Sequence, residues 1–141
     1  MSTTRQNSRR QAGETAGPDP RRWQAPAVGD HEPQENGPVT LINIFEVPAD
    51  QVEEFIAQWR VRAHIMASAP GFRDARMHRA VSSQARFQLV NVAHWDSQAD
   101  LEAAQDTGAF QDRIRALRED PQMRFSAYPA LYEVVSVLGE P

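Results

Sequence analysis

After residue 38 the pattern of apolar and polar positions predicts four strands. The four segments are VTLINIFEV, FRDARMHRAV, RFQLVNVAHW and ALYEVVSVL, which cover 39–47, 72–81, 86–95 and 130–138, and the first is rich in β-branched residues. Proline or a cluster of turn residues bounds the first three segments, as is typical of strands in an antiparallel sheet. The first strand ends before Pro48, and the turn between the second and third strands lies at 82–84.

Helical spacing of apolar residues fills two of the intervals between these strands. Asp50 and Glu53 match a capping box in front of an apolar stripe that runs through 52–66. Ser97 opens a second helical region, which breaks near Gly108 and then resumes. The resulting order, βαββαβ, is the ferredoxin-like arrangement of an α+β fold, with both helices on one face of a four-stranded antiparallel sheet.

Both faces of the predicted sheet contain apolar residues. In the first strand, Leu41, Asn43 and Phe45 lie on one side, and Ile42 and Ile44 lie on the other. An antiparallel sheet with one face in water alternates cleanly between apolar and polar residues, and this sheet does not. The simplest cover for the second face is the same sheet of another subunit, which predicts a homodimer.

Residues 1–37 form a different kind of segment. They contain no Leu, Ile or Phe, and their five arginines balance five acidic residues. Such a segment buries too little apolar surface to offset the entropy lost on ordering. The composition therefore predicts a disordered N-terminal arm over 1–37, followed by one domain over 38–141.

Composition also narrows the partners and the chemistry. A net charge of −4 gives no basic surface for nucleic acid. No stretch approaches the roughly 18 apolar residues of a membrane span, so we expect a cytoplasmic protein. Cysteine is absent, and all fifteen basic residues are arginine. These absences exclude thiolate nucleophiles, thiolate metal sites and Schiff-base lysines.

Two polar side chains interrupt an otherwise apolar strand face. Alternation puts Asn91 and Trp95 on the same face of the third strand, where Asn43 of the first strand could join them. One interpretation is structural: Asn91 satisfies nearby backbone and Trp95 fills the core. The other is that an amide N–H and an indole N–H point into a cavity, where they stabilise an oxygen that becomes negative during a reaction.

The histidines offer one further candidate. His78 could enter the pocket from the second strand as an acid or base, or be an ordinary, partly buried histidine. No pair of histidines has the spacing of metal ligands on a helix, and we expect no metal site.

The stretch VNVAHWDS resembles the corresponding strand of the antibiotic biosynthesis monooxygenase family, whose members are dimeric α+β barrels. TLINIFEVPADQVEEFIAQW, the Pro70-Gly71-Phe72 turn and the closing PALYEVV are also similar to the family, so the resemblance covers about 38–138. It implies that Asn91 and Trp95 contact an oxygen of the substrate.

The sequence departs from particular branches of that family. Anthrone-oxidising members have a tyrosine six residues after the tryptophan, where this chain has Leu101. Their helical arginine corresponds to Arg115, for which an ordinary surface position is the alternative. Haem-degrading members also have a first-strand asparagine, but their ligating histidine aligns with Ile114, and no histidine follows His94. Haem degradation is therefore not expected.

The resemblance and the residues together favour a cofactor-independent monooxygenase of secondary metabolism. No flavin or nicotinamide motif is present, so no cofactor is expected and the substrate itself must supply electrons to dioxygen. A small phenolic or polyketide-like aromatic substrate meets that requirement. The expected apolar walls are Phe45, Phe55, Leu89, Leu101 and Phe110. The alternatives are a non-oxidative polyketide cyclase or isomerase and a binding protein for a hydrophobic metabolite.

Overall fold

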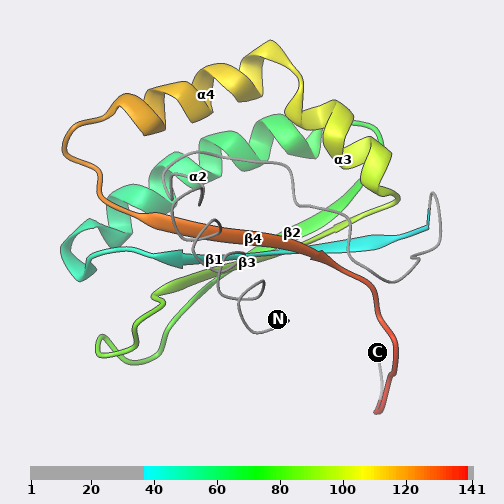
Figure 1. Ribbon diagram of the computed structural model, residues 1–141, viewed down its shortest axis with the longest axis horizontal. Helices are drawn as coiled ribbons and strands as arrows, with labels where there is room; N and C mark the ends of the chain where they lie inside the picture. Colours follow the sequence, from blue (N-terminus) through cyan, green and yellow to red (C-terminus); the bar gives the residue numbers. More distant parts are fainter. Residues whose placement is uncertain (1–36, 140–141) are drawn as a thin grey trace, which may run out of the picture.

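Four antiparallel strands form one sheet, in the order β2-β3-β1-β4, in a computed structural model that describes residues 37–139 (Figure 1). The strands are β1 (Val39–Glu46), β2 (Phe72–Arg79), β3 (Leu89–Trp95) and β4 (Ser126–Tyr132). The first and third strands of the sequence lie side by side in the centre of the sheet. This order confirms the predicted ferredoxin-like α+β fold.

In the described part of the chain, three α-helices cover one face of the sheet (Figure 1). They are α2 (Val52–Ala67), α3 (Gln98–Gln105) and α4 (Gly108–Glu119). Ser97 caps α3 by accepting a hydrogen bond from the backbone N–H of Asp100, and Thr107 caps α4 by accepting one from Phe110. The second helical region is therefore two capped helices, and the predicted break near Gly108 is confirmed.

Alternation along the two central strands decides what is buried. Leu41, Asn43 and Phe45 of β1 lie opposite Ala93, Asn91 and Leu89 of β3, and all six are buried. Because successive side chains point to opposite faces, one set of residues from both strands meets the helices. On this side the ring of Phe55 packs 4.8 Å from that of Phe45 and 5.3 Å from that of Phe125.

Two predicted boundaries are wrong. The last strand covers 126–132 rather than 130–138, and Pro129 fits there because β4 is an edge strand that needs no N–H on its open side. The apolar residues after it are exposed, and the chain there turns away from the helices (Figure 1). Asp50 does not cap α2, because a 3-10 turn, η1 (Ala49–Gln51), precedes the helix.

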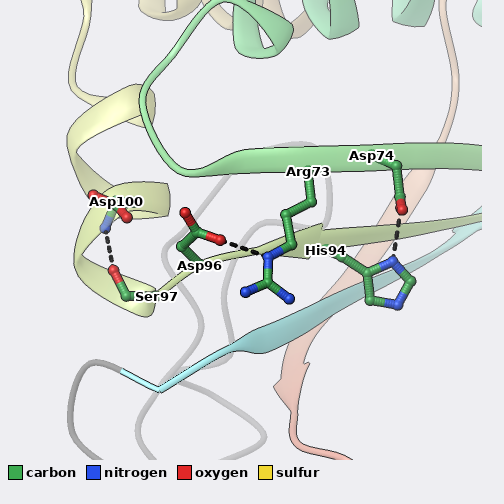
Figure 2. A network of polar contacts seen from close by, with 6 residues as sticks. All are labelled: Arg73, Asp74, His94, Asp96, Ser97 and Asp100. Atoms are coloured by element: carbon green, nitrogen blue, oxygen red, sulfur yellow. Dashed lines mark hydrogen bonds and ion pairs between the residues drawn. The ribbon is translucent and has the colours of Figure 1, made fainter.

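An irregularity near the start of β2 changes which side chains face the helices. The register with β3 shifts between Phe72, which pairs with Trp95, and Asp74, which pairs with His94. A bulge of this kind gives the strand one extra residue, so the side chains before and after it lose their common parity. Asp74 consequently bonds His94 on the face away from the helices, at 2.7 Å (Figure 2).

The turn before β2 packs tightly against the start of α3. Gly71 has φ +88°, and its carbonyl accepts the N–H of Asp96 at 2.8 Å. Next to it, Arg73 bonds Asp96 across the strand pair (Figure 2). This corner joins β2, the end of β3 and the first turn of α3.

The prediction for the N-terminal arm concerns residues that the structure does not describe. The predicted arm over 1–37 lies outside the described residues, apart from Gly37. Within 37–139, no helix combines the length and the apolar character needed to cross a membrane.

Candidate active site

A chamber lies between the helices and the sheet. Its sheet side is formed by Leu41, Asn43, Phe45, Asn91, Ala93 and Trp95, and its helix side includes Trp59, Arg62, Met66, Gln105, Phe110 and Ile114. The wall is mostly apolar, with a few polar side chains placed on it, as is usual for small-molecule sites. All of these residues belong to one chain.

Asn43 and Asn91 form a pair of buried amides on the sheet side. They face each other across β1 and β3 in directly opposed positions, and are 6% and 8% exposed. The Oδ1 atom of each is buried and has no hydrogen-bond partner among the described residues. Rotation of an amide exchanges its oxygen and nitrogen, so each can present either a donor or an acceptor. A buried amide without a partner is uncommon and calls for a ligand or water.

Trp95 completes this side of the chamber. The residue is 1% exposed, and its ring is held edge-on against Phe72, with 5.3 Å between the ring centroids. No hydrogen bond joins its indole N–H to another residue of the described part of the chain. The tryptophan therefore contributes a rigidly packed side chain with a free N–H donor to the same chamber as the amide pair.

Arg62 lies on the opposite wall, on α2. The residue is 7% exposed, and its guanidinium carbon is 5.6 Å from the centroid of the Phe55 ring. Burial lowers the pKa of Arg62 to about 10, so the side chain remains a cation at neutral pH. Among the chamber residues of the described chain, it is the only one that titrates.

The structure brings together five of the ten predicted site residues. Those that line the chamber are Asn43, Phe45, Asn91, Trp95 and Phe110. Three others are buried behind the wall and do not line it: Phe55, Leu89 and Leu101. Their apolar character was the right signal for burial, but it does not distinguish a core residue from a residue at a cavity surface.

Two predicted site residues lie elsewhere. His78 is on the face of the sheet away from the helices, paired with Val90, because the bulge in β2 reverses the expected parity. The expectation that it enters the pocket is therefore wrong. Arg115 is exposed on α4 and pairs with Asp112 at 3.0 Å. It therefore occupies an ordinary surface position rather than a position in the chamber.

Sequence reasoning missed Arg62, Trp59 and Gln105. A signal for Arg62 was available, because it follows Trp59 by three positions and precedes Met66 by four, which places a charged residue on the apolar stripe of the helix. Gln105, at the end of α3, gave no comparable signal. Within 37–139, no cluster of three or more His, Asp or Glu side chains could hold a metal ion.

Comparison with protein families gives a match over most of the described domain. The model of a family described as antibiotic biosynthesis monooxygenase matches residues 38–116, more than half of the chain. The matched range includes both amides of the pair, Trp95 and Arg62.

One curated relative is a haem oxygenase. A mycobilin-producing haem oxygenase of Mycobacterium tuberculosis is 35% identical over 66 residues, which is 47% of this chain and 61% of that protein. The chain thus matches less than two thirds of this curated relative.

Solved structures cover the domain more fully. A protein of Shewanella loihica PV-4, described as a candidate monooxygenase, is 39% identical with a TM-score of 0.58, over 72% of this chain and 97% of that one. SnoaB of Streptomyces nogalater, a cofactor-independent oxygenase, is 25% identical with a TM-score of 0.60, over 74% and 99%. The haem-degrader MhuD of Mycobacterium tuberculosis is 29% identical with a TM-score of 0.55, over 72% and 99%.

Proposed function

The chain belongs to the antibiotic biosynthesis monooxygenase family, and on that basis we propose that it oxidises a phenolic, polyketide-like aromatic molecule with dioxygen and without a bound cofactor. The unpartnered amides of Asn43 and Asn91 carry the proposal. A buried polar group without a partner costs roughly 1–3 kcal/mol. When each amide is rotated so that Nδ2 takes the buried position, a ligand oxygen can accept hydrogen bonds from both amides and from the indole N–H of Trp95, which removes that cost.

The proposed reaction takes its electrons from the substrate. A methylene group between phenolic rings loses a proton, and the charge of the anion spreads to a ring oxygen, where the donors stabilise it. The anion passes one electron to dioxygen, and the two radicals join as a substrate peroxide. Loss of water from the peroxide leaves a carbonyl. One oxygen atom enters the product and the other leaves as water, so no external reductant is needed.

The chamber supplies donors and an apolar wall rather than a base. Neither histidine nor carboxylate lines it in the described chain, and Arg62 is a cation at neutral pH. The proton therefore passes to water, and the donors make this easier by lowering the pKa of the bound substrate. The apolar surroundings strengthen each of those hydrogen bonds by excluding bulk water.

Oxygen dependence tests this proposal. Purified protein and a dihydroxyanthrone are incubated in air and under nitrogen, and the product above the protein-free rate is measured. We expect product only in air, with one dioxygen consumed per product. Equal product in both atmospheres would overturn oxygenation and favour the cyclase or isomerase. Binding without turnover would favour the hydrophobic-metabolite binder.

Haem is a second candidate because a curated relative and a solved structure are both named for haem degradation. The chamber does not fit a haem ligated by histidine. Ile114, which aligns with the ligating histidine of haem-degrading family members, is a buried residue of the chamber wall. No histidine of the described chain lines the chamber. We therefore do not propose haem as the substrate.

The proposed active form is a homodimer joined through the second sheet face. Ile42, Ile44, Val90 and Val92 are only partly buried there, and Tyr128 is 46% exposed beside them. An apolar face of this kind is favourable to cover, and an identical sheet is complementary to it by symmetry. We expect a sedimentation mass of twice 15.9 kDa. A mass of one chain would contradict the pairing.

A further inference from the structure

We infer that Arg62 is a binding residue for a carboxylate of the substrate, so that the chamber selects an aromatic acid rather than a neutral phenol. The inference rests on the proposed function of the same chamber, and it adds a chemical class to the substrate. It starts from a buried cation whose counter-ion is not among the described residues.

Four arginines that do form ion pairs provide the contrast within 37–139. Arg73, Arg79, Arg86 and Arg115 pair with Asp or Glu at the surface, and their side chains are 49–68% exposed. Arg62 is 7% exposed, and no ion pair or hydrogen bond joins it to another residue within 37–139. Its partner there is the face of the Phe55 ring, which offsets only part of the cost of burying a charge.

The position of Arg62 shows where an anion would be held. Arg62 lines the chamber from the α2 side. Asn43, Asn91 and Trp95 line it from the sheet. No Asp or Glu contributes to this lining in the described chain. A ligand between the two walls can therefore meet neutral donors on one side and a cation on the other.

The chemistry of the two walls favours a carboxylate as the partner of Arg62. A guanidinium is charged at neutral pH and presents a planar fork of donors, which suits an anion that is also charged at neutral pH and has two oxygens. Amide and indole donors suit an oxygen that is neutral on binding and gains charge only during the reaction. The sheet wall therefore binds the substrate oxygen that becomes an anion, and Arg62 binds the carboxylate.

Equilibrium binding tests this inference without turnover. The probes are a dihydroxyanthraquinone, which is already oxidised, and its carboxylic acid derivative, each titrated by calorimetry at neutral pH. We expect the wild-type protein to bind the acid about tenfold or more tightly than the neutral quinone, as for a hydrogen-bonded charge pair. Arg62→Met should abolish that preference, lowering affinity for the acid and leaving the neutral quinone within about twofold.

Two controls separate recognition from folding. Arg60→Met removes an exposed arginine from the same helix and should leave both affinities unchanged. The melting temperature of Arg62→Met should equal or exceed that of the wild type, because the substitution removes a buried charge. A lower melting temperature with equal loss for both probes would make Arg62 a structural residue and overturn the inference.

The outcome is also independent of the oxygen test. Absence of a preference for the acid in the wild-type protein overturns the carboxylate inference even where a neutral anthrone is oxidised. A preference that depends on Arg62 supports the inference even where no oxygen is consumed.

Discussion

Replacing Asn91 by leucine is expected to lower kcat/KM of the proposed oxygenation by about 100- to 1,000-fold, the usual effect of removing one donor to a developing oxyanion. The same change should leave the protein as stable as before, or more stable. Asn91 is 8% exposed, and its Oδ1 has no partner among the described residues, so the folded state loses no hydrogen bond. Steady-state oxygen consumption and thermal unfolding measure the two effects.

Gln88 supplies the matched control, because it is a buried amide whose hydrogen bonds are satisfied. Its Nε2 donates to the carbonyls of Ser82 and Ala85, at 3.2 and 2.6 Å, and so holds the loop before β3. Gln88→Leu should lower the free energy of unfolding by roughly 1–3 kcal/mol and leave kcat/KM unchanged. Turnover by Asn91→Leu within a few fold of the wild type would contradict the role given to the amide pair.

Replacing Gly71 by alanine is expected to destabilise the domain by roughly 2–4 kcal/mol, the sum of left-handed strain and overpacking. Gly71 has φ +88°, a conformation in which a side chain is strained. A Cβ placed on it would lie 2.5 Å from both Cβ and Cγ of Asp100, in the first turn of α3. Since the turn leads into Phe72, which holds Trp95, the chamber wall should shift as well. Chemical denaturation measures the loss.

Gly108 is the control for this substitution. It begins α4 without a positive φ, and a Cβ there would have no atom within 4 Å. Gly108→Ala should therefore leave the stability unchanged or raise it by about 0.4–1 kcal/mol, through the lower entropy of the unfolded chain. Equal stability of the Gly71 and Gly108 variants would show that the corner between β2 and α3 tolerates a side chain.

The sheet side of the chamber could be predicted because strand alternation is strict. Asn91 and Trp95 are four residues apart, and therefore share a face in any regular strand. The register of β1 with β3 places Asn43 directly opposite Asn91. The sequence showed an asparagine on an apolar face of each strand, but it did not fix how the two strands align. The convergence of these three residues on one cavity agrees with that prediction.

The error at His78 has a single physical cause. Counting parity from Phe72 assumes a regular strand, and the bulge between Phe72 and Asp74 breaks that assumption. One extra residue moves every later side chain of a strand to the other face. Nothing in RDARM marks the bulge, because no glycine or proline stands there.

The helix side was harder to predict than the sheet side. An arginine on an apolar stripe can extend its charged head into water while its stem packs, so Arg62 alone does not indicate burial of the charge. The last strand was misplaced because Val134, Val135 and Val137 have high β-propensity, yet they have no strand partner in the described chain. Propensity identifies a segment that fits a sheet, and the partner decides whether it joins one.

The central claim is that this chamber transfers an oxygen atom to a substrate that supplies its own electrons. The most direct test is turnover of a dihydroxyanthrone by the purified protein under dioxygen labelled with oxygen-18, in ordinary water and without added reductant. The account predicts one labelled oxygen atom in each product molecule, as read by mass spectrometry. Product without the label, whose new oxygen would then come from water, would contradict it.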